Sequence, residues 1–358
     1  MHIFRYFCKE IFSAFIALTV IILLIFLSNQ FVQYLSRAAS GQLPGMVVLQ
    51  LMALEVPNLL CLLLPLGFYV SILLAYGRLY AENEMVVLFA AGFSQKRLAF
   101  YTFIIALMVA ALVSYLVFFV NPGIYHGRAK LIRNQGVETL IKTIVPERFR
   151  SIAGGKQVFY VKEMTRSHTE AKNIFFAEQV PGKNHPEYKV MWAASGKTKY
   201  DLVDRQTNLI LNDGLLYEGI PGQADYKTYK FGKLVAPIPA PNIIVSDDVR
   251  TLSNKKLLPF DNKNLNLVAE LQWRLSIPMM VLTLTFLALP LSKVNARQGK
   301  YARLIPALII YILYANLMFM GRDWLIQGLV PWWVGLWWLH GLVFLIALNL
   351  MYWQKKRL

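Results

Sequence analysis

Six apolar runs, each long enough to cross a bilayer, constrain this chain more than any other feature. A membrane-spanning helix needs about 20 mainly apolar residues in succession. Runs of that kind lie at residues 11–34, 55–76, 99–120, 272–291, 304–321 and 332–353. Charged residues make up only 16% of the 358-residue chain, whereas soluble domains have about 25%. We therefore predict a membrane protein with six transmembrane α-helices.

A long polar stretch, residues 123–268, separates the third run from the fourth. Within it, segments rich in β-branched and aromatic residues alternate with turn signals such as Pro181-Gly182. Segments of this length and spacing predict the short strands of a β-sandwich or barrel. They lie at 156–164, 172–180, 188–200, 207–219 and 226–238.

The predicted architecture therefore has three parts, with three spans on each side of an inserted β-domain. Residues 1–122 hold the first three spans and a short helix at about 82–91. Residues 123–268 form the β-domain with partly helical connectors, and residues 269–358 hold the last three spans.

Basic residues in the short loops predict the orientation, because they gather on the cytoplasmic side of a membrane. If the N-terminus is cytoplasmic, the inside segments hold twelve such residues and the short outside segments hold only two, Arg37 and Arg322. The twelve are Arg5, Lys9, Arg78, Lys96, Arg97, Lys293, Arg297, Lys300, Arg303, Lys355, Lys356 and Arg357. The sequence thus predicts cytoplasmic termini and a β-domain that faces outward.

The outward domain also carries a positive charge. Residues 121–271 have 22 basic and 15 acidic side chains, a net charge of +7, within a chain whose net charge is +17. Such a domain suits an anionic partner, for example a phosphorylated lipid or an acidic protein. A solvated surface without a specific partner explains the charge equally well.

Motifs for catalysis, nucleotide binding or metal binding are absent from the sequence. The SGKT tetrapeptide at 195–198 ends like a phosphate-binding loop, but Met191 stands where that loop requires a glycine. The five histidines and the two cysteines, Cys8 and Cys61, have no metal-ligand spacing. We expect no cofactor in this chain and no enzymatic activity.

Ionisable residues are also absent from the centres of the predicted spans. Glu55, Arg274 and the Arg322-Asp323 pair lie near the span ends, where pairing or snorkelling of a charged side chain costs little. An ion-coupled carrier would carry an acid or base near the bilayer midplane. If the chain transports a molecule, we expect the energy to come from another subunit.

The stretch YAENEMVVLFAAGFSQKRL, residues 80–98, lies between two spans on the predicted cytoplasmic side. Glu82 and Glu84 are expected in the first turn of a short helix, where negative charge complements the helix dipole. Gly92 is expected to end this helix and Ser94 to cap the next one. An interfacial helix with solvated acids and a helix that plugs into a basic-rimmed groove of a soluble partner both fit.

Five stretches carry a resemblance to a known family. They are IFRYFCKE (3–10), EVPNLLCLLLPLGF (55–68), GRLYAENEMVVLFAAGFS (77–94), LQWRLSIPM (271–279) and LPLSKVNARQGKYARLIPA (289–307). The chain resembles the LptF/LptG (YjgP/YjgQ) family of lipopolysaccharide export permeases over essentially its full length. The last stretch resembles the LptF branch of that family rather than the LptG branch.

The resemblance implies a permease subunit of an ATP-driven ABC transporter in the inner membrane of a Gram-negative cell. Such a subunit extracts lipopolysaccharide and passes it to a periplasmic bridge toward the outer membrane. The implied partners are the paired permease LptG, a dimer of the ATPase LptB that binds the ATP and Mg, and the proteins LptC and LptA. The last two are expected to extend the periplasmic β-jellyroll of this chain by edge-strand addition. Glu84 matches the coupling glutamate of the family, which contacts the ATPase, and Glu82 lies beside it.

The resemblance also implies a lipid cavity lined by the outer end of the first span, SNQFVQYLSR, residues 28–37. Many relatives carry Lys or Arg where this chain has Gln30 and Gln33, so the phosphate-binding charge is expected from Arg37 or from the paired permease. Phe26 and Phe31 are candidates for the cavity lining, and they fit lipid-facing or helix-packing positions equally well.

Two alternatives remain open at this point. A permease for another outer-membrane cargo, such as lipoproteins, would usually have four spans with the large domain after the first span, which disagrees with the predicted layout. A membrane-anchored scaffold that only docks periplasmic partners would have no reason for a short helix like that at 82–91.

Overall fold

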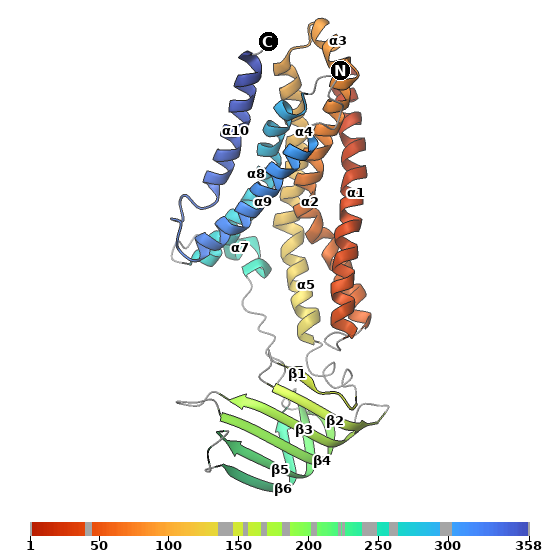
Figure 1. Cartoon of the computed structure of the whole chain (residues 1–358), viewed down its shortest axis with the longest axis vertical. Coiled ribbons are helices and arrows are strands. Elements are labelled where there is room, and N and C mark those ends of the chain that lie inside the picture. Colours follow the sequence, from red (N-terminus) through yellow and green to blue (C-terminus); the bar gives the residue numbers. More distant parts are fainter. Residues whose placement is uncertain are drawn as a thin grey trace. The chain divides into compact units, whose positions relative to one another are not determined.

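The computed structural model (Figure 1) describes residues 2–39, 45–134, 146–152, 157–165, 170–180, 187–201, 206–220, 223, 226–237, 249–257, 264–293 and 303–356. The chain divides into two compact units. The helical unit comprises residues 1–30, 52–127 and 248–358, and the sheet unit comprises residues 31–51 and 128–247.

Helices account for most of the described residues outside the β-sheet. They are α1 His2–Ala39, α2 Gly45–Ala81, α3 Glu84–Ala90, α4 Gln95–Tyr115, the π-helix η1 Leu116–Val120, α5 Asn121–Asn134, the 3-10 helix η3 Val249–Thr251, α7 Asn254–Leu257, α8 Leu265–Leu291, α9 Leu304–Ile326 and α10 Trp337–Lys356.

Five helical stretches among the described residues are long and apolar enough to cross a membrane: His2–Ala39, Val47–Ala81, Gln95–Leu131, Leu265–Leu291 and Leu304–Ile326. The predicted number of six spans is therefore not confirmed. The sixth run does form a helix, α10, but this helix starts at Trp337 because residues 332–336 form turns.

The core of the helical unit lies around α2 and α8. In the most apolar stretch of each of these two helices 72% of the residues are buried, compared with 17% in α1 and 28% in α9. Large aromatic side chains of α2 fill this core, among them Phe68, Tyr69 and Tyr76. Pro57 and Pro65 lie inside α2 without ending it, as is common for helices surrounded by other helices in a membrane.

The sheet unit contains one six-stranded antiparallel sheet in which every strand pairs with its neighbours along the chain. Its strands are β1 Arg150–Ile152, β2 Gln157–Met164, β3 Glu170–Val180, β4 Glu187–Asp201, β5 Gln206–Gly219 and β6 Lys227–Pro237. The five predicted strands are confirmed, whereas the three-residue β1 was not predicted. The described strands form a single sheet in sequential order, so the jellyroll stays a prediction.

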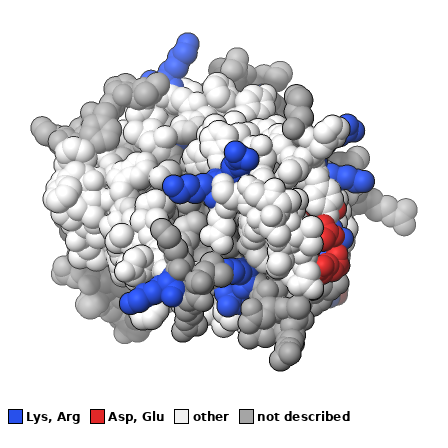
Figure 2. All heavy atoms as spheres, turned by 90° about the horizontal axis from the view of Figure 1, so that it is seen from above, with Lys and Arg blue, Asp and Glu red and all other residues white. Residues whose placement is uncertain are grey.

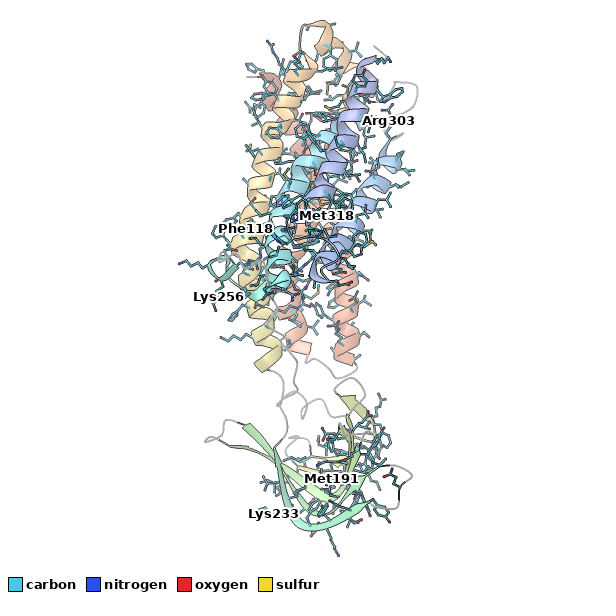
Figure 3. All side chains as sticks on the ribbon, turned by 90° about the vertical axis from the view of Figure 1, so that its left-hand side faces the viewer. Phe118, Met191, Lys233, Lys256, Arg303 and Met318 are labelled. Carbon is cyan, nitrogen blue, oxygen red and sulfur yellow. The ribbon has the colours of Figure 1, made fainter. Side chains whose placement is uncertain are left out.

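A crease across the sheet encloses its small core. In a regular strand, side chains that face the same side are two residues apart. Ala171 and Ile174 are three residues apart, yet both are buried in one apolar cluster, because Asn173 between them has a positive φ of 50°. Asp213, with a φ of 51°, produces the same reversal in β5. Figure 3 shows the resulting bend, with Met191 among the side chains gathered inside it.

Candidate functional site

The short helix α3 and its flanking turns form the site that the sequence singled out, and all of these residues belong to the helical unit. Helix α2 continues to Ala81, and α3 begins at Glu84 after Asn83, which has a φ of 60°. Glu84 therefore lies in the first turn of α3 as expected. Glu82 does not, because it lies in the turn before the helix, where the left-handed Asn83 reverses the chain direction.

The end of α3 agrees with the sequence. Gly92 has a φ of +88°, a conformation that glycine adopts without steric cost and that commonly ends a helix. The Ser94 side chain accepts a hydrogen bond from the Arg97 backbone N–H at 3.3 Å and caps α4. These two residues turn the chain sharply between α3 and α4.

The Glu84 carboxylate contacts the N-terminal part of α1. The Tyr6 hydroxyl donates a hydrogen bond of 2.6 Å to Glu84 Oε2, and both side chains lie partly buried. Glu84 therefore points toward the helical unit rather than straight into solvent. Sequence reasoning missed Tyr6, because 78 positions separate it from Glu84 and no local pattern links the two.

A second contact joins α1 to the end of α2. Arg78 Nη2 donates to Glu10 Oε2 at 2.6 Å, and Arg78 Nη1 lies 3.7 Å from Glu82 Oε2. The Arg78, Glu10 and Glu82 side chains are 35%, 23% and 50% exposed, so water screens these pairs. Arg78 thus links the turn before α3 to α1, in parallel with the Tyr6–Glu84 contact.

An aromatic cluster supports α3 from inside the helical unit. Phe7 of α1 and Phe93, which follows α3, are both buried, and their ring centroids are 5.8 Å apart. Phe93 also contacts Tyr101 of α4 at 5.8 Å, and Met85 of α3 is fully buried. These contacts fix one side of α3, so any partner must bind its other side.

The outer side of α3 is apolar. Val86 and Val87 are 57% and 67% exposed, and Ala90 is exposed as well. Figure 2 shows the end of the molecule that carries α3 in Figure 1. Lys and Arg side chains are spread over this face, and Asp and Glu gather near its rim. An exposed apolar ridge beside a few charged groups is suited to docking a protein.

The candidate lipid-cavity residues all lie on α1. Phe26 is 43% and Phe31 41% exposed, Gln33 and Arg37 are exposed, and Gln30 is partly buried. Phe26, Gln30, Gln33 and Arg37 follow the i, i+4, i+7, i+11 spacing that shares one helix face, whereas Phe31 does not.

Arg37 is held near an aromatic ring. Its guanidinium carbon lies 5.9 Å from the centre of the buried Tyr34 ring, and that of Arg128 lies at the same distance from this ring. Both distances suit a cation–π contact. The positive charge expected at the end of α1 is therefore shared between Arg37 and a residue of α5 that the sequence did not indicate.

A buried group of charges lies at the opposite end of the helical unit. Arg274 and Glu270 are 3% and 4% exposed, and Arg274 Nε donates to Glu270 Oε1 at 2.9 Å. Of the two alternatives expected for Arg274, pairing and snorkelling, the structure shows pairing. Arg322 contacts Glu270 Oε2 at 2.7 Å, not its neighbour Asp323. The i, i+4 spacing of Glu270 and Arg274 is the signal that could have revealed the pair.

Metal binding has no candidate site in the part of the chain that the structure describes. Among these residues, no three His, Cys, Asp or Glu side chains gather closely enough to hold a metal ion. What the α3 end offers chemically is a docking surface and a set of contacts to α1.

Comparisons with known proteins add a family to this geometry. Residues 5–353 match the family described as "Lipopolysaccharide export system permease LptF/LptG". The chain is 29% identical over 320 residues to the lipopolysaccharide export system permease protein LptF of Escherichia coli strain K12, which covers 88% of this chain and 84% of the relative. The protein of the same name from Shigella flexneri has the same identity and coverage.

Proposed function

Since the chain belongs to the lipopolysaccharide export system permease LptF/LptG family, we propose that it is a permease subunit of an ATP-driven transporter. Its cargo is lipopolysaccharide, which the transporter extracts from the inner membrane of a Gram-negative cell and passes to a periplasmic bridge. The observation that carries this proposal is α3, an apolar ridge exposed at Val86 and Val87 and attached to α1 through Tyr6 and Arg78.

The proposed orientation puts the α3 end in the cytoplasm and the sheet unit in the periplasm. The loop charges support it, because twelve basic residues fall in the segments predicted to be cytoplasmic and two in the short outer segments. The proposed partners are a paired permease, LptG, in the same membrane and, on the cytoplasmic side, a dimer of a separate ATPase, LptB, that binds ATP and Mg. On the periplasmic side they are LptC and LptA, added to the edges of the sheet.

The contacts around α3 suggest how work done by the ATPase reaches the membrane. A groove of the ATPase holds Val86 and Val87, while the buried Met85 and the aromatic cluster keep α3 attached to the helical unit. When the ATPase closes, α3 moves, and the Tyr6–Glu84 and Arg78–Glu10 contacts pull on α1. In this proposal α1 carries the lipid-contacting residues Phe26 to Arg37, so its displacement changes the cavity.

Co-purification of the transporter tests the proposal. The chain is expressed with the paired permease and a tagged ATPase, and the amount recovered with the tag is measured. Val87→Asp puts a charge into the docking ridge, and the loss of a central apolar contact costs about 2 kcal/mol, roughly a thirtyfold weaker complex. Val235→Asp is the matched control, because Val235 is similarly exposed, at 53%, in the sheet unit. No recovery of the wild-type chain, or equal recovery of both variants, would contradict the proposal.

A further inference from the structure

Three polar side chains on the first turns of α8 each hold a different segment of the helical unit. Glu270, Gln272 and Arg274 are 4%, 6% and 3% exposed. Buried polar groups of this kind are expensive unless they are hydrogen-bonded or paired. We call these three residues the α8 hub. Each of them is hydrogen-bonded, and none of the contacts involves the α3 end.

Gln272 holds the turn between α9 and α10. Its Nε2 donates to the Trp332 carbonyl at 2.6 Å, and its Oε1 accepts from the Leu336 backbone N–H at 2.9 Å. Gly335 lies directly against this side chain, where a Cβ atom would overlap Gln272, and it has a positive φ of 43°. Only glycine fits at this point of the turn.

Arg274 holds the connector through which the chain returns from the sheet to α8. Its Nη1 donates to Asn254 Oδ1 at 2.9 Å, and its Nη2 donates to the carbonyls of Arg250 and Leu252, each at 3.1 Å. All three guanidinium nitrogens of Arg274 are therefore occupied, with Nε on Glu270. Such a set of bonds fixes the connector, residues 249–254, firmly to α8.

The connector is also tied to the third membrane-spanning stretch. Asn254 Nδ2 donates to the Phe118 carbonyl at 2.7 Å, within the π-helix η1. Figure 3 shows Phe118 on the same side of the bundle as Lys256 of α7. A π-helix is an irregularity that occurs frequently at functional positions. The same asparagine thus joins η1 to Arg274.

Glu270 links this fixed group to α9. Arg322 Nη2 donates to Glu270 Oε2 at 2.7 Å, and the Arg322 guanidinium carbon lies 5.1 Å from the centre of the Trp273 ring. Helix α9 is otherwise largely exposed, with 28% of its most apolar stretch buried. The Arg322–Glu270 pair is the one ion pair that joins α9 to α8 among the described residues.

A cavity beside this pair leaves room for α9 to move. It has a volume of about 210 Å³ and is lined by polar as well as apolar side chains, including Asn58, Asn121, Trp273 and Phe319. Asn121 Oδ1 is buried and has no hydrogen-bond partner among the described residues. A cavity of this size and polarity has room for water, and the Arg322 side chain can turn into it when it leaves Glu270.

From these contacts we infer that Glu270 is a positioning residue, which makes the outer end of α9 and the connector of the sheet move together. One carboxylate oxygen is bound to Arg274, which fixes the connector, and the other is bound to Arg322 of α9. A change in the position of α9 is therefore transmitted through the Arg322 contact to the connector, residues 249–254. This inference rests on the proposed function, because it concerns the passage of lipid from the spans to the sheet.

Distance measurements between two spin labels test the inference directly. Labels are placed at Lys256 of α7 and at Leu329 after α9, both exposed, in a chain whose two cysteines have been replaced. We expect one narrow distance distribution in the wild type and a broadened one in Glu270→Gln, which keeps the shape of the side chain but loses the charge that binds Arg322 and Arg274. Asp323→Asn is the matched control, because it removes an exposed carboxylate next to Arg322 and outside the hub.

Transport measurements on the complete transporter supply the second readout. We expect Glu270→Gln to lower the lipopolysaccharide released per ATP hydrolysed by about tenfold, the size of a typical coupling free energy, while the rate of ATP hydrolysis stays within twofold, ~0.4 kcal/mol. If Glu270→Gln does not fold, Arg322→Gln breaks the same contact from the α9 side, where the side chain is 17% exposed.

The outcomes separate this inference from the proposed function. An unbroadened distance distribution together with an unchanged release per ATP in either variant would overturn the role of Glu270. If the wild-type transporter releases no lipopolysaccharide on ATP addition, the proposed function fails. The spin-label distances then still decide whether Glu270 links α9 to the connector.

Discussion

The two ends of the helical unit hold their polar contacts in different ways. At the α3 end, Arg78 and Glu10 are 35% and 23% exposed, and such pairs contribute about 0–1 kcal/mol. In the α8 hub, the side chains of Arg274 and Glu270 alone are 3% and 5% exposed, and removing one partner of a buried pair costs about 3–5 kcal/mol. Contacts at the α3 end can thus be exchanged at little cost, as a docking site requires. Contacts in the hub are suited to a permanent attachment.

The largest effect is expected from a substitution that breaks the contacts of the α8 hub. Arg274→Ala leaves Glu270 with a buried charge and frees the connector, so we expect the free energy of unfolding to fall by about 3–5 kcal/mol. The free energy of unfolding is measured on the full chain in mixed micelles, by raising the fraction of a denaturing detergent. Arg97→Ala is the control, because that side chain is exposed and its loss is expected to cost less than about 0.5 kcal/mol. Equal losses of unfolding free energy in the two variants would contradict the distinction between exchangeable contacts at the α3 end and permanent contacts in the hub.

A smaller effect is expected at the α3 end. Tyr6→Phe removes one hydrogen bond to a carboxylate, worth about 1.5 kcal/mol or somewhat more, and leaves Glu84 available to the ATPase. Glu84→Ala removes this bond and any contact of Glu84 with the ATPase. ATPase binding is measured for both variants and for the double variant. The comparison isolates the interaction free energy between Tyr6 and Glu84.

If Glu84 acts only by holding α3 against α1, the two single variants will bind the ATPase equally. If Glu84 also contacts the ATPase, Glu84→Ala will bind it more weakly than Tyr6→Phe. Full binding by Glu84→Ala would contradict both roles.

A weaker effect is expected at the outer end of α1. Replacing Arg37 by Ala removes one exposed charge, worth at most about 1 kcal/mol, so crosslinking of lipopolysaccharide to α1 should fall by up to about fivefold. Gln33→Ala serves as the comparison, because it lies on the same helix face without a charge. Unchanged crosslinking in Arg37→Ala would leave this residue with an anchoring role beside Tyr34 only.

The smallest expected effect concerns an exposed pair in the sheet. Lys189 Nζ lies 2.8 Å from Glu218 Oε1, and this hydrogen bond raises the pKa of Lys189 above its ordinary value. Both side chains are partly exposed, so Glu218→Gln is expected to cost about 0.5 kcal/mol at neutral pH.

The pH dependence of that pair has a definite sign. Because the folded pKa of Lys189 is raised, the pair contributes fully below the unfolded value of about 10.4 and its contribution is lost as the pH rises through the folded pKa. The difference in stability between the wild type and Glu218→Gln should therefore shrink above about pH 10.4. A difference that grows with pH would contradict the pairing.

Much of the fold could be predicted from the sequence, because span length and strand alternation are local signals. The five strands from 156 to 238 and the helices α1, α2, α4, α8 and α9 follow from such patterns. The three-residue β1 is too short to leave a pattern. The extra length of α2, which reaches from Gly45 to Ala81, depends on packing that no local pattern records.

The candidate site could be predicted only in part. Glu84 and the end of α3 follow from local chemistry, whereas the partner Tyr6 is 78 residues away. Likewise, the sequence shows Arg274 as a charge near a span end, but the Arg274–Asn254 contact joins residues 20 positions apart and the Glu270–Arg322 contact joins residues 52 positions apart. Long-range pairs of this kind depend on the folded arrangement of the helices.

Release of lipopolysaccharide from proteoliposomes tests the link between α3 and transport most directly. The complete transporter is reconstituted with labelled lipopolysaccharide, ATP is added, and the lipid transferred to a soluble periplasmic acceptor is measured. We expect ATP-dependent transfer by the wild type and its loss in Val87→Asp. Transfer by Val87→Asp at the wild-type rate, or transfer by the wild type that does not depend on ATP, would contradict a role of α3 in coupling ATP hydrolysis to lipid release.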